Sequence, residues 1–182
     1  MTRILIVGPS ASGKSTLADR VADEVGLPKL HLDDYFIPRA KAFVETPNGR
    51  VRTFERPSLY DGNKLARDAA AIRGGIVIEG FCLFAYPEIL ALGGSRYYLD
   101  APFSLCRERR AARRPQRYSD RSFAIVGESE TLRFVVPQRE IPDVHVLNGR
   151  LPTAELTRQV LEVVGRVGVV SCQSTYASSL GR

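Results

Sequence analysis

The chain has 182 residues, which suits one domain with a sizeable hydrophobic core. Hydrophobic residues make up 44% and charged residues 25%, the ordinary shares of a soluble globular protein. No apolar run reaches the roughly 18 residues that span a bilayer, and the N-terminus has no signal-peptide pattern, so we expect no membrane partner. Cys82, Cys106 and Cys172 fit neither a disulfide framework nor a zinc site, which favours a reducing cytoplasm.

The first predicted elements are a buried strand, Ile4–Val7, and a helix that ends at Val25 with Gly26 as its left-handed cap. Between them lies the phosphate-loop pattern G-x-x-x-x-G-K-[ST]. Its glycines let successive N–H groups face one anion, and the helix N-terminus adds its positive end. The lysine supplies charge for the β- and γ-phosphates, and the serine a hydroxyl for Mg²⁺. The residues expected to bind a nucleoside triphosphate are Gly8, Ser10, Ala11, Ser12, Gly13, Lys14, Ser15 and Thr16.

A short second strand, Lys29–Leu32, is followed by Asp33, Asp34 and Tyr35 at its carboxyl end. Ligands of open α/β sheets bind outside the carboxyl ends of the strands. The two acids there suit a role in orienting a hydroxyl, accepting its proton or holding Mg²⁺ through water. An Asx-turn that caps the next segment is the alternative. After a phosphate loop we favour function for the acids, while His31 is interpreted as a strand residue rather than a catalyst.

A hairpin is predicted within about 40–56, because Asn48-Gly49 is a strong tight-turn signal between two strand-like runs. Glu55 follows it, and Asp61 precedes a predicted helix. Both acids are candidates to hold a polyhydroxylated substrate. Asp61 suits the cap of that helix equally well.

The next predicted strand, Ile76–Ile78, ends at Glu79. An acid in that place faces Mg²⁺ or its water shell, unless it is only a loop acid at the sheet edge. The strand Tyr97–Asp100 leads to an arginine-rich helix that Ser104 is placed to cap.

The net charge of +6 is concentrated in this arginine-rich helix and the segment after it. We favour a phosphate clamp over a nucleic-acid face, because a phosphate loop is already present. Arg109 and Arg113 share one helix face. The polar stretch 114–129 lacks an apolar period and is interpreted as a mobile lid. A solvated helix followed by a disordered loop is the alternative.

A last strand, Val144–Leu147, and a helix capped by Thr153 complete the predicted domain, 1–170. The segment 171–182 is expected to be a flexible tail. Strands alternate with helices throughout. The predicted fold is therefore α/β, a P-loop NTPase whose five-stranded parallel sheet is covered by helices on both faces, with a lid.

The residues from about Ile4 to Gly149 resemble the uridine kinase and nicotinamide riboside kinase group of phosphate-loop kinases. Six features in order carry the resemblance: Ala11-Ser12-Gly13-Lys14-Ser15-Thr16, Asp33-Asp34-Tyr35-Phe36, Phe54-Glu55-Arg56-Pro57 with Tyr60-Asp61, Glu79-Gly80-Phe81-Cys82-Leu83-Phe84, the run Arg107 to Arg114, and Pro142-Asp143-Val144.

The resemblance implies transfer of the γ-phosphate of ATP, with Mg²⁺, to the 5′-hydroxyl of a ribonucleoside. It implies that Asp33 is the catalytic base and that Glu79 is the acid associated with Mg²⁺. Glu55 stands where the family has an aspartate that grips the ribose, and Arg109 and Arg113 match arginines that contact phosphate and substrate. The segment with which uridine kinases read the base is missing here, so we expect loose reading of the base.

Three other functions remain open from the sequence. One is a kinase for another small hydroxyl compound, such as nicotinamide riboside, pantothenate or a sugar. Another is a nucleotide-dependent switch module, which does not need an acid such as Asp33 beside an acceptor. The last is a nucleic-acid-binding protein that uses the arginine stretch, whose binding to any duplex would depend steeply on salt.

Overall fold

The computed structural model describes residues 1–113 and 117–176, and for 166–176 the backbone only. The α-helices are α1 Lys14–Val25, α2 Gly62–Ala71, α3 Pro87–Ala91, α4 Phe103–Ala111, α5 Tyr118–Glu130 and α6 Thr153–Tyr176. The strands are β1 Thr2–Val7, β2 Lys29–His31, β3 Ala42–Thr46, β4 Gly49–Thr53, β5 Gly75–Gly80, β6 Ser95–Asp100 and β7 Val144–Asn148.

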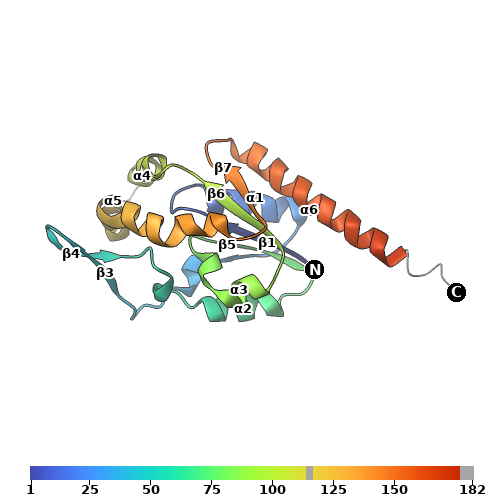
Figure 1. The fold of residues 1–182 in the computed structure, drawn as a ribbon, viewed down its shortest axis with the longest axis horizontal. Helices are drawn as coiled ribbons and strands as arrows, with labels where there is room; N and C mark the ends of the chain where they lie inside the picture. Colours follow the sequence, from blue (N-terminus) through green and yellow to red (C-terminus); the bar gives the residue numbers. More distant parts are fainter. Residues whose placement is uncertain (114–116, 177–182) are drawn as a thin grey trace.

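Five of these strands form one parallel sheet in the order β2-β5-β1-β6-β7 (Figure 1). This confirms the predicted sheet. Because β1 is the central strand and the chain returns to either side of it, the strand order switches direction at the carboxyl end of β1. A ligand crevice forms at such a switch point, and the phosphate loop follows β1 there.

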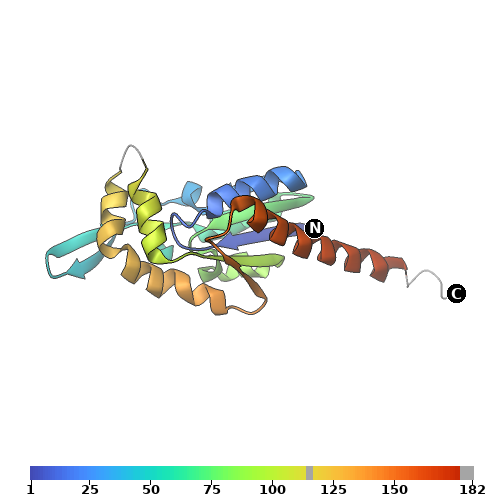
Figure 2. The same ribbon diagram turned by 90° about the horizontal axis from the view of Figure 1, so that it is seen from above.

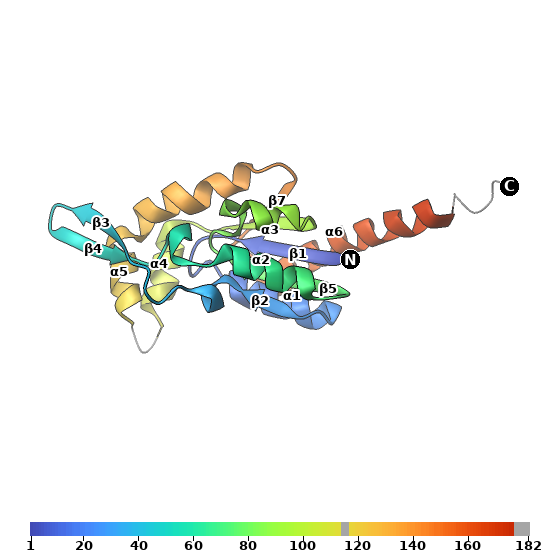
Figure 3. The ribbon, with the colours of Figure 1, turned by 90° about the horizontal axis from the view of Figure 1, so that it is seen from below.

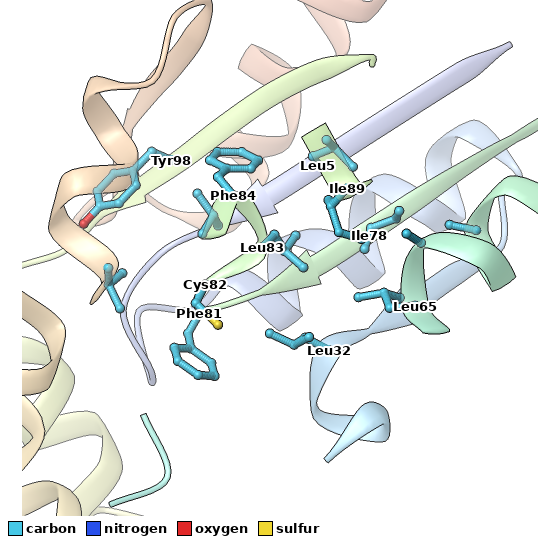
Figure 4. Close-up of a cluster of buried hydrophobic side chains, with 14 of the residues drawn as sticks. Leu5, Leu32, Leu65, Ile78, Phe81, Cys82, Leu83, Phe84, Ile89 and Tyr98 are labelled. Carbon is cyan, nitrogen blue, oxygen red and sulfur yellow. The ribbon is translucent and has the colours of Figure 1, made fainter. Parts of the chain in front are cut away.

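The alternating side chains of β1 bind the two helical layers to the sheet. Ile4 and Ile6 pack with α1 and α6 on one face. Leu5 and Val7 pack on the other face with side chains of β5, α2 and α3, such as Leu65 (Figure 4). In Figure 3, α2 and α3 lie side by side over the strands. A strand covered on both faces has apolar residues at successive positions, which explains the continuous run in β1.

The hairpin and the last helix extend from opposite ends of the molecule. β3 and β4 pair outside the main sheet around Asn48-Gly49, as predicted, and project at one end (Figure 1). At the other end α6 continues to Tyr176, beyond the predicted start of the tail at 171, while 177–182 lie outside the described residues. Within the described chain, none of the helices has the length and apolar character needed to cross a membrane.

One local prediction, the helix cap at Ser104, differs from the structure. α4 begins at Phe103, so the cap position is Pro102 and Ser104 lies inside the helix. The stretch predicted as a lid contains helix α5, which packs beside α4 and against β4 (Figure 2). Its buried side chains, among them Phe123 and Val126, anchor one face, and this short apolar face is why the stretch is helical. Residues 114–116 of the predicted lid lie outside the described residues.

Candidate active site

A cavity of about 830 Å³ opens at the carboxyl ends of the parallel strands, where the phosphate loop meets α4 and α5. Its lining comes from five segments that are far apart in the sequence. The lining residues are Ser10, Ala11, Gly13, Lys14, Ser15, Thr16, Asp33, Phe36, Phe54, Glu55, Tyr60, Phe81, Arg110, Arg113, Arg117, Tyr118, Ser119 and Asp120. This volume suits a small-molecule site.

The backbone of the phosphate loop depends on its two glycines. A Cβ on Gly8 would lie 2.6 Å from the carbonyl oxygen of Leu99, a distance that no side chain tolerates. Gly13 has φ of 103°, in the left-handed region, and α1 begins at the next residue. The loop lines the cavity from Ser10 to Thr16 except at Ser12, whose side chain is buried and turned away, and Gly8 also lies outside the lining.

Glu79 lies near the end of β5, beside Lys14 and Ser15 at the start of α1 and His31 at the end of β2. Its Oε1 accepts a hydrogen bond of 2.9 Å from Ser15 Oγ and also contacts His31 Nδ1. Its Oε2 is 4.0 Å from Lys14 Nζ. Glu79 is 3% exposed, so these contacts replace water around its carboxyl group. The sequence placed Glu79 and Ser15 in one site, but not His31.

The electrostatics of this group favour a charged Glu79. Burial raises the pKa of Glu79, but the charge of Lys14 and hydrogen bonds from His31 and Ser15 outweigh burial and hold that pKa below its ordinary value. The hydrogen bond to Glu79 raises the pKa of His31. The carboxylate is therefore ionised at neutral pH.

The same residues fit a Mg²⁺ ion that arrives with a nucleotide. Glu79 Oε2 is buried and has no hydrogen-bond partner in the described part of the chain, which leaves one carboxylate oxygen free. The Ser15 hydroxyl adds a second hard oxygen. The described residues contain no group of three or more His, Cys, Asp or Glu that would hold a metal alone. Mg²⁺ is often bound in this way, through few protein oxygens, phosphates and water.

Asp33 is the acid of the Asp-Asp pair that reaches the cavity. It follows β2 in a short 3₁₀ turn, is exposed and lines the cavity, whereas Asp34 is exposed outside the lining. Tyr35 is turned away, and its hydroxyl donates to Asp68 at 2.9 Å. Asp61 caps α2 by accepting from the Lys64 N–H at 2.8 Å and lies outside the lining. Tyr35 and Asp61 thus lie outside the cavity lining, and Asp61 is the helix cap that the sequence offered as an equal alternative.

Glu55 is held by a buried network that the sequence did not reveal. It is 5% exposed and accepts from Ser10 Oγ at 2.5 Å and from Arg110 Nη1 at 2.9 Å. Arg110 Nε donates to Asp120 Oδ1 at 2.7 Å, at the start of α5. The network joins the phosphate loop, the segment after β4, α4 and α5. Ordering of any one of these segments therefore affects the others.

Arg109 lies in α4, but Arg113 lies beyond its end at Ala111, so the two do not share one helix face as predicted. Arg109 donates to the carbonyl oxygens of Ser12 at 2.6 Å and Gly149 at 3.4 Å, so it braces the phosphate loop from outside the cavity lining. Arg113 lines the cavity as expected. Arg110, which we did not single out, is the buried one. Its spacing from Cys106, which is also buried, is the sequence signal that points to it.

Five aromatic side chains form part of the cavity lining, called here the aromatic wall. Phe36, Phe54, Tyr60, Phe81 and Tyr118 line the cavity, and most of them contact one another. Phe81 is 2% exposed and belongs to the core. Phe36, Phe54 and Tyr60 are half-buried, so part of each remains available to a ligand.

A phosphate loop after the central strand of this sheet, with a cavity beside it, defines a phosphate-loop kinase, an enzyme that transfers phosphate from ATP to a small molecule. The chain belongs to the AAA domain family, whose model matches residues 4–133.

Its curated relatives include adenylate kinases. That of Clavibacter michiganensis subsp. michiganensis is 30% identical over 183 residues, 92% of this chain and 91% of the relative. That of Pseudarthrobacter chlorophenolicus is 35% identical over 100 residues, 50% of this chain and 48% of the relative.

Solved structures of kinases share the fold. A gluconokinase from Sinorhizobium meliloti 1021 superposes with a TM-score of 0.59 at 17% identity, over 98% of this chain and 97% of that one. A shikimate kinase from Aquifex aeolicus gives 0.57 at 18% identity, over 92% and 99%. These matches agree with the kinase part of the predicted resemblance. Its narrower part, the likeness to uridine kinases, stays a prediction.

Proposed function

We propose that this enzyme transfers the γ-phosphate of ATP to the 5′-hydroxyl of a ribonucleoside-like acceptor. The observation that carries the proposal is that Asp33 and the aromatic side chains line the same cavity. A carboxylate at the acceptor suits a hydroxyl, because it accepts the proton that the hydroxyl loses. It repels an acceptor that is itself a phosphate, such as the adenylate in the name of the curated relatives.

The rest of the cavity supports a flat, hydroxyl-bearing acceptor. Glu55 keeps unused lone pairs after its bonds to Ser10 and Arg110, since a carboxylate offers about four acceptor sites. Vicinal ribose hydroxyls suit those sites. Phe36 or Phe54 stacked on a base would contribute about 1–3 kcal/mol with little dependence on which base it is.

The phosphate end is proposed to work through the phosphate loop and Mg²⁺. Lys14 would meet the β- and γ-phosphates, and Ser15 and Glu79 would hold the ion directly or through water. When bound, Mg²⁺ neutralises charge that develops on the transferred phosphoryl group. We further propose that the start of α5, beside the cavity at Tyr118 and Ser119, moves as a lid when substrates bind.

The proposal is tested by kcat/KM with ATP across uridine, cytidine, nicotinamide riboside and their 2′-deoxy forms, with AMP, gluconate, shikimate and pantothenate as competing acceptors. A stacking site discriminates far less than the roughly 10⁴-fold of a site that hydrogen-bonds one base edge. We therefore expect base swaps to cost less than removal of the 2′-hydroxyl. Preference for AMP, or activity with a non-nucleoside alone, would overturn the proposal, and the Lys14→Ala variant provides the background rate.

A further inference from the structure

His31, which the sequence predicts to be only a strand residue, lies against the acid of the phosphate site. β2 pairs with β5 so that His31 and Glu79 are opposite each other in the parallel register. The Nδ1 atom of His31 contacts Glu79 Oε1. A carboxylate only accepts hydrogen bonds, so Nδ1 carries the proton in this contact. The imidazole is partly exposed, with 28% of its side-chain surface accessible.

The two oxygens of Glu79 have different surroundings. Oε1 is used by both His31 and Ser15, whereas Oε2 has no hydrogen bond in the described chain and is 4.0 Å from the Lys14 ammonium. A carboxylate on a flexible side chain would otherwise turn to bring either oxygen, or both, to the lysine. Donors from two sides of Oε1 fix the plane of the carboxylate and direct Oε2 toward the phosphate loop.

We propose that His31 is a positioning residue, which holds Glu79 so that Oε2 serves the Mg²⁺ that accompanies ATP. His31 itself touches neither the metal nor the nucleotide and lies outside the cavity lining. Partners that orient an acid of a metal site commonly change metal affinity by about 10–100-fold when removed. The inference rests on the proposed use of Mg²⁺ and concerns the phosphate end, so it does not depend on the acceptor.

The experiment measures binding of a non-hydrolysable ATP analogue by calorimetry at one pH, in excess EDTA and at a series of MgCl₂ concentrations. The variants are His31→Ala, which removes the donor, and His31→Asn, whose amide nitrogen replaces Nδ1. His145→Ala is the matched control, because it alters the second of the two histidines, an exposed residue of β7. Thermal denaturation checks that each variant is folded.

We expect His31→Ala to leave analogue binding in EDTA within about twofold and to lower the gain from MgCl₂ about tenfold or more. His31→Asn should recover most of that gain, and His145→Ala should match the wild type. The free Mg²⁺ concentration needed for half-maximal kcat should be highest for His31→Ala, lower for His31→Asn and lowest for His145→Ala and the wild type. The value of kcat at saturating Mg²⁺ should change much less.

Equal loss of affinity with and without MgCl₂ would mean that His31 acts on the loop and not through Glu79, and an unchanged gain would also overturn the proposal. If His31→Ala is unfolded, His31→Leu replaces it, because leucine fills the space without a hydrogen-bond donor. The gain from MgCl₂ is then compared between His31→Leu and His31→Asn, and an equal gain would overturn the proposal. If MgCl₂ does not strengthen analogue binding by the wild type, the proposed use of Mg²⁺ fails first.

Discussion

Replacement of Arg110 by methionine tests whether the buried network holds the cavity together. The methionine keeps most of the apolar stem but removes the guanidinium, which donates to Glu55 at 2.9 Å and to Asp120 at 2.7 Å. The guanidinium also lies 4.3 Å from the centre of the Phe123 ring, on α5. The side chains of both acids are less than a tenth exposed, so water cannot replace the lost donors without a rearrangement.

The expected loss follows from those environments. Removal of one partner from a buried ion pair costs about 3–5 kcal/mol, since the other charge stays buried and unpaired. Each acid keeps one donor, Ser10 Oγ for Glu55 and the Arg117 N–H for Asp120, so the loss should stay in that range rather than double. For a chain of this length the change corresponds to a fall in Tm of roughly 6–20 °C.

Urea and thermal unfolding of the metal-free protein measure this loss. Arg107→Met is the matched control, because Arg107 is an exposed arginine of the same helix and should change the free energy of unfolding by no more than about 0.5 kcal/mol. A loss below about 1 kcal/mol for Arg110→Met would refute the reasoning, since it would show that Glu55 and Asp120 do not depend on this arginine.

Four further predictions follow from the site. Lys14→Ala should abolish phosphoryl transfer in a protein that still unfolds cooperatively; turnover close to normal would show that the phosphate-loop assignment is wrong. Asp33→Asn should lower kcat by about 10²–10⁴-fold with ATP binding little changed, and a loss under tenfold would move the base elsewhere. Hydrogen exchange at the start of α5 should slow when ATP, Mg²⁺ and acceptor are added together, and unchanged exchange would leave α5 a fixed wall of the cavity. The last prediction concerns pH. The raised pKa of His31 stabilises the fold at pH values below about 6.5, and the lowered pKa of Glu79 stabilises it at pH values above about 4.5. In urea unfolding, His31→Asn should therefore destabilise the metal-free protein more at pH 5.5 than at pH 8.5. Equal losses at the two pH values would contradict an ion pair between His31 and Glu79.

Features that depend on a few neighbouring residues were predictable from the sequence. The phosphate loop is one, because Gly8 and Gly13 meet local backbone requirements and Lys14 follows at a fixed spacing. The five parallel strands are another, since short strand-like runs alternate with helical patterns along the chain. The order of the strands in that sheet comes from the structure alone. Asp33 and Glu79 could be assigned to one edge of the sheet because both come directly after parallel strands.

Only the tertiary structure decided which side chains meet at that edge. Arg109, Arg110 and Arg113 look alike in the sequence, but the rotation of α4 against the core sends Arg110 inward to Glu55, which is 55 residues away. The same kind of packing turns Tyr35 toward Asp68, away from the cavity. His31 meets Glu79 across 48 residues because β2 and β5 pair in one register. Local sequence determines where a strand or loop forms, whereas strand register and helix rotation minimise the exposed apolar surface of the whole chain, and these set the direction of each polar side chain.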